Sequence, residues 1–152
     1  MDVHIRWMIR RDMREVLQIE FEAFEFPWSE DDFNRVLFQR NAIGVVAEHK
    51  HEVIGFVIYS LHKTRLELLN FAVSPKVHRQ GVGRRLAEHL VKKLHAGRRT
   101  RLTANVRESN LAAQLFLRAV GFRAVNVVRG LYEDTPEDAY AMVYRLRTEA
   151  TV

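Results

Sequence analysis

A basic turn interrupted by two glycines is the stretch of the sequence best suited to hold a ligand. It reads Arg79-Gln80-Gly81-Val82-Gly83-Arg84 and follows the apolar segment Asn70-Phe71-Ala72-Val73. Glycine has no Cβ, so the main-chain N–H groups of such a turn can approach a ligand closely. A helix that begins there adds the positive end of its dipole, and guanidinium groups suit phosphate oxygens. The spacing therefore predicts an anion site between a strand and a helix.

Two well-known phosphate-binding fingerprints fit this turn poorly. A dinucleotide-binding turn needs a third small residue where Leu86 stands, and no Gly-Lys-Ser/Thr sequence follows, as a nucleoside triphosphate loop requires. The alternative interpretation is a tight turn with solvated arginines. The glycine pair alone does not choose between an anion site and such a turn.

Further segments, taken together with this turn, resemble the acetyl-CoA-binding core of the GNAT acetyltransferase superfamily. The wider match resembles its RimI-like branch, the ribosomal-protein-alanine N-acetyltransferases. The segments that carry it are Phe26-Pro27-Trp28-Ser29, Asn70-Phe71-Ala72-Val73, the glycine turn, Val106-Arg107-Glu108-Ser109-Asn110, Gly121-Phe122, and Arg129 with Tyr132. The resemblance covers nearly the whole chain, and the joint spacing is far more specific than any single motif.

The resemblance implies a binding site for acetyl-CoA. The main chain of Phe71, Ala72 and Val73 would hold the pantetheine arm and the thioester. The pyrophosphate would bind to the turn, that is to Arg79, Gln80, Gly81, Val82, Gly83 and Arg84. Asn110 would contact the cofactor from the start of the following helix, although an asparagine there is equally suited to cap that helix.

In the resembled family, the segment before the second helix forms one wall of the acceptor groove. Phe26, Pro27 and Trp28 are therefore candidates for holding the first residue of a peptide acceptor. The alternative places most of the aromatic residues between 21 and 28 in the core, with the nearby acids complementing a helix dipole.

The chain departs from the family pattern at two positions that matter for acid–base chemistry. It has Asn105 where the family carries a glutamate proposed as general base, and Leu117 where it carries a tyrosine proposed as general acid. Neither side chain can exchange a proton near neutral pH. About a tenth of an α-amine with a pKa of about 7.7 to 8.0 is neutral at pH 7, whereas a lysine near pKa 10.4 faces a penalty of about 4.6 kcal/mol. Loss of the base therefore favours an N-terminal or other weakly basic amine over a lysine side chain as acceptor.

Two residues are candidates to replace the missing acid and base. Glu67 could take the amine proton through water, and its alternative role is that of a solvent-facing strand residue paired with Arg65. Tyr132 matches a tyrosine that the resemblance places against the acceptor, and its hydroxyl could protonate the thiolate. The alternative is a buried structural tyrosine. The partner tyrosine of the family's loop is Leu131 here.

Hydrophobic periodicity predicts the elements that position these residues. We expect strands near residues 3–7, 43–47, 53–61, 66–73, 102–106, 122–128 and 140–146. Asp12 would cap a first helix with apolar positions at 13, 16, 17, 20, 21 and 24, Ser29 and Asp32 would form a capping box for a second, and a third would run from 81 to about 96 before Gly97. Ser109 would cap a fourth helix that ends at Gly121.

These elements indicate an α/β fold with an antiparallel meander followed by a βαβ crossover. The resemblance implies a GNAT fold, a mixed central sheet of about seven strands with a splayed central pair, flanked by about four helices. With 152 residues, 47% of them hydrophobic, we expect one domain over residues 1–147 and a disordered tail over 148–152.

The composition limits the kinds of ligand and partner that we expect this protein to bind. The net charge of +5 favours an anionic partner, but the arginines are spread from Arg6 to Arg147, which argues against a dedicated nucleic-acid module. The chain has no cysteine, which excludes a thiolate metal site and a cysteine acyl-enzyme, and its histidines lack zinc-site spacing, so we expect no metal. It has no secretory leader and no apolar run of eighteen residues, so we expect a cytoplasmic protein without membrane attachment.

The sequence thus predicts an acetyl-CoA-dependent N-acetyltransferase. The predicted acceptor is the N-terminal α-amine of a protein, attacked directly in a ternary complex, and the protein would be a monomer or a homodimer. A small-molecule amine is the alternative acceptor. Because of Asn105 and Leu117, a catalytically silent acyl-CoA-binding or sensor domain is the alternative from another class. A basic nucleic-acid-binding module is a further one.

Overall fold

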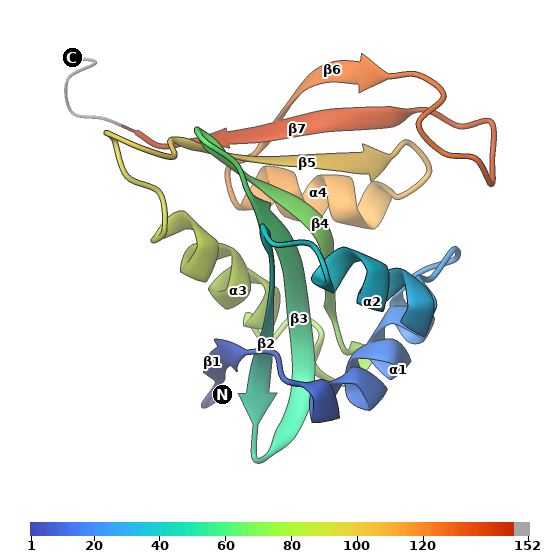
Figure 1. Ribbon diagram of the computed structural model, residues 1–152, viewed down its shortest axis with the longest axis vertical. Helices are drawn as coiled ribbons and strands as arrows, with labels where there is room; N and C mark the ends of the chain where they lie inside the picture. Colours follow the sequence, from blue (N-terminus) through green and yellow to red (C-terminus); the bar gives the residue numbers. More distant parts are fainter. Residues whose placement is uncertain (148–152) are drawn as a thin grey trace. The chain divides into compact units, whose positions relative to one another are not determined.

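The computed structural model describes residues 1–147, and the predicted tail at 148–152 lies outside the described residues. Within that range it has seven strands and four α-helices, with the sheet order β1-β2-β3-β4-β5-β7-β6 (Figure 1). The strands are β1 (His4–Trp7), β2 (Ala42–His49), β3 (Glu52–Leu61), β4 (Arg65–Val73), β5 (Arg101–Arg107), β6 (Arg123–Val128) and β7 (Ala139–Arg145). The helices are α1 (Met13–Ala23), α2 (Glu30–Leu37), α3 (Val82–Val91) and α4 (Leu111–Ala119). The predicted α/β class with a mixed seven-stranded sheet and four helices is confirmed.

The chain divides into two compact units. The first unit consists of Met1–Leu61 with Leu69–His89, and the second consists of His62–Leu68 with the described residues from Leu90 to 147. Both β4 and α3 run from one unit into the other. The boundary within β4 falls where its parallel register with β5 ends, at the pair Leu68↔Ala104.

In the first unit, β1, β2 and β3 form an antiparallel sheet. The predicted polar turn joins β2 to β3, and Lys50 and His51 have the positive φ angles of 50° and 66° that reverse the chain there. The core of this unit joins α1, α2 and the strands through buried apolar residues. These are Val16, Ile19, Phe33, Val46, Val53, Phe56, Ile58 and Ala72.

The start of α1 differs from the prediction. Asp12 occupies the N-cap position, but its buried side chain makes no capping hydrogen bond to the helix. Its carboxylate instead accepts bonds from Arg6 Nη1 at 2.8 Å and from the Ile9 N–H at 2.8 Å. The predicted cap is therefore wrong, because an ion pair with the first strand outcompetes the local bond.

The predicted capping box at the start of α2 is confirmed. Ser29 Oγ accepts from the Asp32 N–H at 3.1 Å, and Asp32 Oδ2 accepts from the Ser29 N–H at 2.8 Å. One residue later, Phe33 is fully buried and makes edge-on ring contacts with Trp28 and Phe56. The cap thus fixes the point at which α2 turns its apolar face into the core.

In the second unit, the first residues of β4 pair with β5 in parallel, and β5, β7 and β6 continue as an antiparallel sheet (Figure 1).

The helix before β5 is shorter than predicted. Helix α3 ends at Val91, and the N–H groups of Lys93 and Leu94 reach back only three residues. Gly97 does not end it. It lies instead in a separate turn in which the His95 N–H donates to the Arg99 carbonyl.

Helix α4 begins one residue later than predicted. Asn110, and not Ser109, is its N-cap, since Asn110 Oδ1 accepts from the Ala113 N–H at 3.1 Å. Gly121 ends the helix as predicted, with a φ of 107°. The next residue, Phe122, is buried beside Tyr144 with ring centroids 5.9 Å apart.

Replacing Gly121 by alanine tests this helix end. A Cβ there would lie 2.9 Å from Tyr144 Cε2 in a conformation that side chains rarely adopt, so we expect the free energy of unfolding to fall by about 2 to 4 kcal/mol. Gly130→Ala is the matched control. It has a φ of 66° but open space around the Cβ, and should cost about 1 kcal/mol. Urea unfolding measures both, and equal losses would contradict the role of Tyr144.

Candidate functional site

The glycine turn adopts a conformation that leaves it open to a ligand. Arg79 and Gly81 both have positive φ angles, 65° and 81°, and a Cβ on Gly81 would meet nothing within 4 Å. The first hydrogen bond of α3 runs from the Arg85 N–H to the Gly81 carbonyl at 3.0 Å. The N–H groups of residues 82–84 therefore have no acceptor within the helix. Val82 is buried and anchors the turn. These features fit a diphosphate.

The arginines at this turn are not all available to bind a ligand. Arg79 and Arg84 are exposed. Arg85 donates to the carbonyls of Met1 and Val3, at 3.2 and 3.3 Å, and so ties the start of the chain to α3. All three side chains are exposed, but Arg85 is engaged by main-chain carbonyls at the start of the chain.

The predicted thioester segment forms the last part of β4. Ala72 is buried, whereas Phe71 and Val73 are half-buried. The Phe71 N–H donates to Asn70 Oδ1 at 2.9 Å, and the Val73 carbonyl lies 3.2 Å from His78 Nε2. The main-chain groups expected to hold the cofactor arm thus have side-chain partners in this structure.

The predicted acceptor segment lies between α1 and α2 in the same unit. Phe26 and Pro27 are exposed, and Phe26 is 36% exposed. The Trp28 ring instead packs edge-on against Phe33, with centroids 5.1 Å apart, so this ring belongs partly to the core. Phe26 and Pro27 therefore offer the larger surface to a ligand.

Sequence reasoning missed Glu20, which joins the acceptor segment to β4. Its side chain is 1% exposed. It accepts hydrogen bonds from the Trp28 N–H at 2.9 Å and from Asn70 Nδ2 at 2.7 Å. Burial raises its pKa, although both hydrogen bonds oppose that shift. The signal in the sequence was an acid at a position of the predicted apolar face. Phe21 was assigned to the same face, but it is 72% exposed.

Tyr132 lies over Arg107 in the second unit. Its ring centroid is 3.8 Å from Arg107 Cζ, the geometry of a cation–π contact. Burial raises the pKa of Tyr132, and Arg107 opposes the shift. The phenol therefore keeps its proton at neutral pH.

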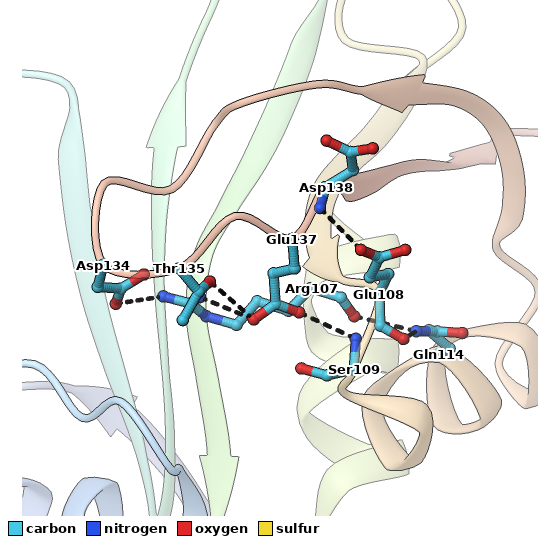
Figure 2. A network of polar contacts seen from close by, with 8 residues as sticks. All are labelled: Arg107, Glu108, Ser109, Gln114, Asp134, Thr135, Glu137 and Asp138. Carbon is cyan, nitrogen blue, oxygen red and sulfur yellow. Dashed lines mark hydrogen bonds and ion pairs between the residues drawn. The ribbon is translucent and has the colours of Figure 1, made fainter.

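Arg107 also fixes the loop that carries Tyr132 (Figure 2). Its guanidinium donates to Asp134 Oδ2 at 2.7 Å, to Glu137 Oε2 at 3.1 Å and to Thr135 Oγ1 at 3.1 Å. Burial alone would lower the pKa of Arg107, but its hydrogen bonds to Asp134 and Glu137 raise the pKa overall. The sequence quoted Arg107 as part of a motif without identifying this role.

Glu137 connects the same loop to the start of α4. Its Oε1 accepts from the Ser109 N–H at 3.0 Å, and its hydrogen bonds with Ser109 and Arg107 lower its pKa to about 2. Nearby, the Asp138 N–H donates to Glu108 Oε1 at 3.0 Å. The loop is thus held at several points to the residues that follow β5 (Figure 2).

Glu67 has partners that match its non-catalytic alternative. Its Oε1 lies 3.3 Å from His62 Nε2 and 3.7 Å from Arg65 Nη2. It stands opposite Thr103 in the part of β4 that pairs with β5. The ion pair with Arg65 is present, and the catalytic role of Glu67 stays a prediction.

The two positions that depart from the family pattern are ordinary parts of the second unit. Asn105 is exposed on β5 opposite Ala141, and Leu117 is a buried residue of α4. Among residues 1–147 no group of three His, Cys, Asp or Glu side chains could hold a metal ion. In the same range, none of the helices has the length and apolar character needed to cross a membrane.

Comparison with known proteins gives one consistent result. Residues 13–122 match the family model described as Acetyltransferase (GNAT) family. The chain is 33% identical over 133 residues to the [ribosomal protein bS18]-alanine N-acetyltransferase of Escherichia coli (strain K12), covering 86% of this chain and 89% of that protein. It is 30% identical over 146 residues to the N-alpha-acetyltransferase RimI of Mycobacterium tuberculosis (strain ATCC 25618 / H37Rv), covering 92% of this chain and 90% of the other.

The fold is similar to that of solved relatives. The crystal structure of the ribosomal-protein-S18-alanine N-acetyltransferase from Escherichia coli superposes with a TM-score of 0.83 at 30% identity. The match covers 97% of this chain and 96% of the other. The predicted GNAT fold is thereby confirmed.

The lowered pKa of Glu137 gives a pH prediction. An acid whose pKa is lowered by folding stabilises the fold fully above its ordinary pKa of 4.5, and this contribution is lost as the pH falls towards 2. In urea titrations, Glu137→Gln should therefore be less stable than the unsubstituted protein at pH 6, and the gap should narrow by pH 3.

Glu133→Gln is the matched control, because Glu133 is exposed on the same loop. Its stability should differ little from that of the unsubstituted protein at either pH. A gap for Glu137→Gln that is as large at pH 3 as at pH 6 would show that the carboxylate charge does not hold the loop.

Proposed function

This chain belongs to the acetyltransferase (GNAT) family, and we propose that it acetylates the N-terminal α-amine of a protein. As a member of that family it uses acetyl-CoA as the acetyl donor. The observation that carries the choice of acceptor is the match, over 86% of the chain, to an enzyme named for acetylating the alanine of a ribosomal protein. An N-terminal alanine of a ribosomal protein is therefore the acceptor class that we propose.

Residues of the first unit are suited to bind the cofactor. The N–H groups at 82–84 and the exposed side chains of Arg79 and Arg84 would hold the diphosphate. The main chain at Phe71, Ala72 and Val73 would orient the arm. The contact of Asn110 with the cofactor stays a prediction. When bound, acetyl-CoA supplies an acetyl group activated as a thioester.

The chemistry that the side chains must support is modest. The neutral amine forms the new C–N bond to the acetyl carbonyl carbon while the C–S bond breaks. The amine loses a proton, and the thiolate gains one. Tyr132, whose hydroxyl is protonated at neutral pH, is the proposed donor to the thiolate. The chain has no cysteine to form a thioester of its own, in keeping with direct transfer in a ternary complex.

The acceptor's own pKa compensates for the missing base. With Asn105 in place of the family's glutamate, the amine must lose its proton to water or to Glu67 before attack. For an α-amine this costs at most about 1.4 kcal/mol at pH 7, and for a lysine about 4.6 kcal/mol. This difference supports an N-terminal amine over a side-chain amine.

A panel of acceptors tests the proposal. Thiol release from acetyl-CoA would be measured with a peptide that begins with alanine, the same peptide N-acetylated, a blocked peptide containing lysine, and a polyamine. We expect release only with the free N-terminus, with a rate that rises about tenfold per pH unit below the α-amine pKa. Gly83→Glu should abolish cofactor binding, whereas Gly97→Glu, in an exposed turn, should not.

The panel also separates the alternatives. Asn105 and Leu117 favour, as a second candidate, a silent acyl-CoA-binding domain. Binding of acetyl-CoA in calorimetry without release on any acceptor would establish that candidate. Release with the polyamine alone would indicate a small-molecule acceptor. The proposal would be wrong in both cases.

Tyr132→Phe tests the proton donor. Phenylalanine keeps a ring over Arg107 but removes the hydroxyl, so we expect kcat to fall at least tenfold with an unchanged KM for the peptide. Tyr132→Leu removes the ring as well, and should raise KM in addition. A kcat within twofold of the unsubstituted protein for Tyr132→Phe would return Tyr132 to a packing role.

A further inference from the structure

The first unit holds a buried carboxylate that the proposed chemistry does not use. Glu20 is 1% exposed and lies on the same helix face as the buried Val16 and Ile19. The other charged side chain that acts on it is Asp32, a second acid, and the ion pairs of residues 1–147 do not include it. A buried acid without a counter-charge is costly to keep. An apolar side chain would pack in this place without that cost.

The partners of Glu20 show what its two oxygens do. Oε2 accepts from the Trp28 N–H at 2.9 Å, and Oε1 accepts from Asn70 Nδ2 at 2.7 Å. Asn70 is itself fixed, because its Oδ1 accepts from the Phe71 N–H at 2.9 Å. A continuous chain of three hydrogen bonds therefore runs from the acceptor segment to the main chain of β4, and every residue in it belongs to the first unit.

Only a group with two acceptor oxygens completes this chain. The Trp28 N–H and Asn70 Nδ2 both donate towards position 20, and Asn70 cannot turn its amide around without losing Phe71. Glutamine would present one acceptor and one donor, so it would set its NH2 group against another donor. The hydrogen-bond pattern thus calls for a carboxyl group with two acceptor oxygens, at a site where burial disfavours its ionised form.

We infer that Glu20 is a positioning residue for acetyl transfer, whose carboxylate fixes the acceptor segment at Trp28 relative to the β4 main chain at Phe71. The inference deepens the proposed function and rests on it, because it assigns an acceptor to residues 26–28 and the thioester to residues 71–73. Reaction rates are steeply sensitive to such placement, so the loss of one bond in this chain should appear mainly in kcat.

Exchanging the acid and the amide gives a decisive variant. In Glu20→Gln, the glutamine Nε2 faces Asn70 Nδ2, and in Asn70→Asp two carboxylates face each other. In the double variant Glu20→Gln/Asn70→Asp, Gln Oε1 can accept from Trp28, Gln Nε2 can donate to one aspartate oxygen, and the other oxygen can accept from Phe71. The double variant keeps the net charge of the original pair and restores all three bonds.

Steady-state kinetics with the alanine peptide measures the effect on the full chain. We expect kcat to fall at least tenfold in Glu20→Gln and further in Asn70→Asp, and to return to within about threefold of the unsubstituted protein in the double variant. The affinity for acetyl-CoA in calorimetry should stay within twofold throughout. Glu22→Gln removes the same charge from an exposed position of α1 and should leave kcat unchanged.

Three results would overturn the inference. One is a folded Glu20→Gln variant with the kcat of the unsubstituted protein. Another is a double variant no more active than the single ones. The third is failure of the single and double variants alike to fold, which would mean that Glu20 serves stability through another interaction. Single variants that unfold beside a folded, active double variant would support it.

A separate readout distinguishes failure of this inference from failure of the proposed function. Amide hydrogen exchange at Trp28 and Phe71 requires no acceptor. Exchange should quicken at Trp28 in Glu20→Gln and at both amides in Asn70→Asp, and slow again in the double variant. If the unsubstituted protein acetylates no peptide but this pattern appears, the proposed function is wrong and the hydrogen-bond chain is correct. Unchanged exchange in an active enzyme would disprove the role of the three hydrogen bonds and leave the proposed function intact.

Discussion

Main-chain N–H groups that lie outside the regular ladders are the constraint on which the candidate site depends. Where the chain leaves a helix or strand, an amide finds its acceptor in a side chain, in water or in a ligand. Carboxylates fill this role at Trp28 through Glu20 and at Ser109 through Glu137, and an amide oxygen fills it at Phe71 through Asn70. At the start of α3 the open glycine turn leaves the same kind of group for an anion. Ordered irregular segments and a ligand site thus arise from one requirement.

Much of the fold could be predicted because its signals are local. The capping box at Ser29, the polar turn before β3 and the glycine that ends α4 each depend on residues a few positions apart. The errors have tertiary causes. Asp12 forms an ion pair with Arg6 and makes no capping bond to α1. Phe21 is exposed, whereas its neighbour Glu20 is buried. A hydrophobic pattern cannot reveal that an acid belongs inside when its partner is on another element.

The same distinction between local signals and distant partners applies to the residues of the candidate site. The turn at 79–84 is contiguous, so its residue types indicate an anion site directly. The other residues act through partners far along the chain: Glu20 and Asn70 are 50 positions apart, and Arg107 and Glu137 are 30. Neither pair is visible in spacing. Resemblance to a family identified the segments that contain Asn70 and Arg107, but only the structure shows which atoms they join.

The relative size of catalytic effects explains why positioning should dominate in this chain. Asn105 stands where the family carries a glutamate proposed as general base, and lack of a base costs an α-amine acceptor at most about 1.4 kcal/mol in available neutral form. Correct placement of two reactants can lower the barrier by about 7 to 11 kcal/mol. A chain that loses acid–base groups but keeps the placement of its reactants therefore keeps most of its rate acceleration, provided that its acceptor is weakly basic. Burial opposes the ionised form of Glu20, yet that carboxylate joins the acceptor segment to β4, so a local loss of stability preserves the placement on which the rate depends.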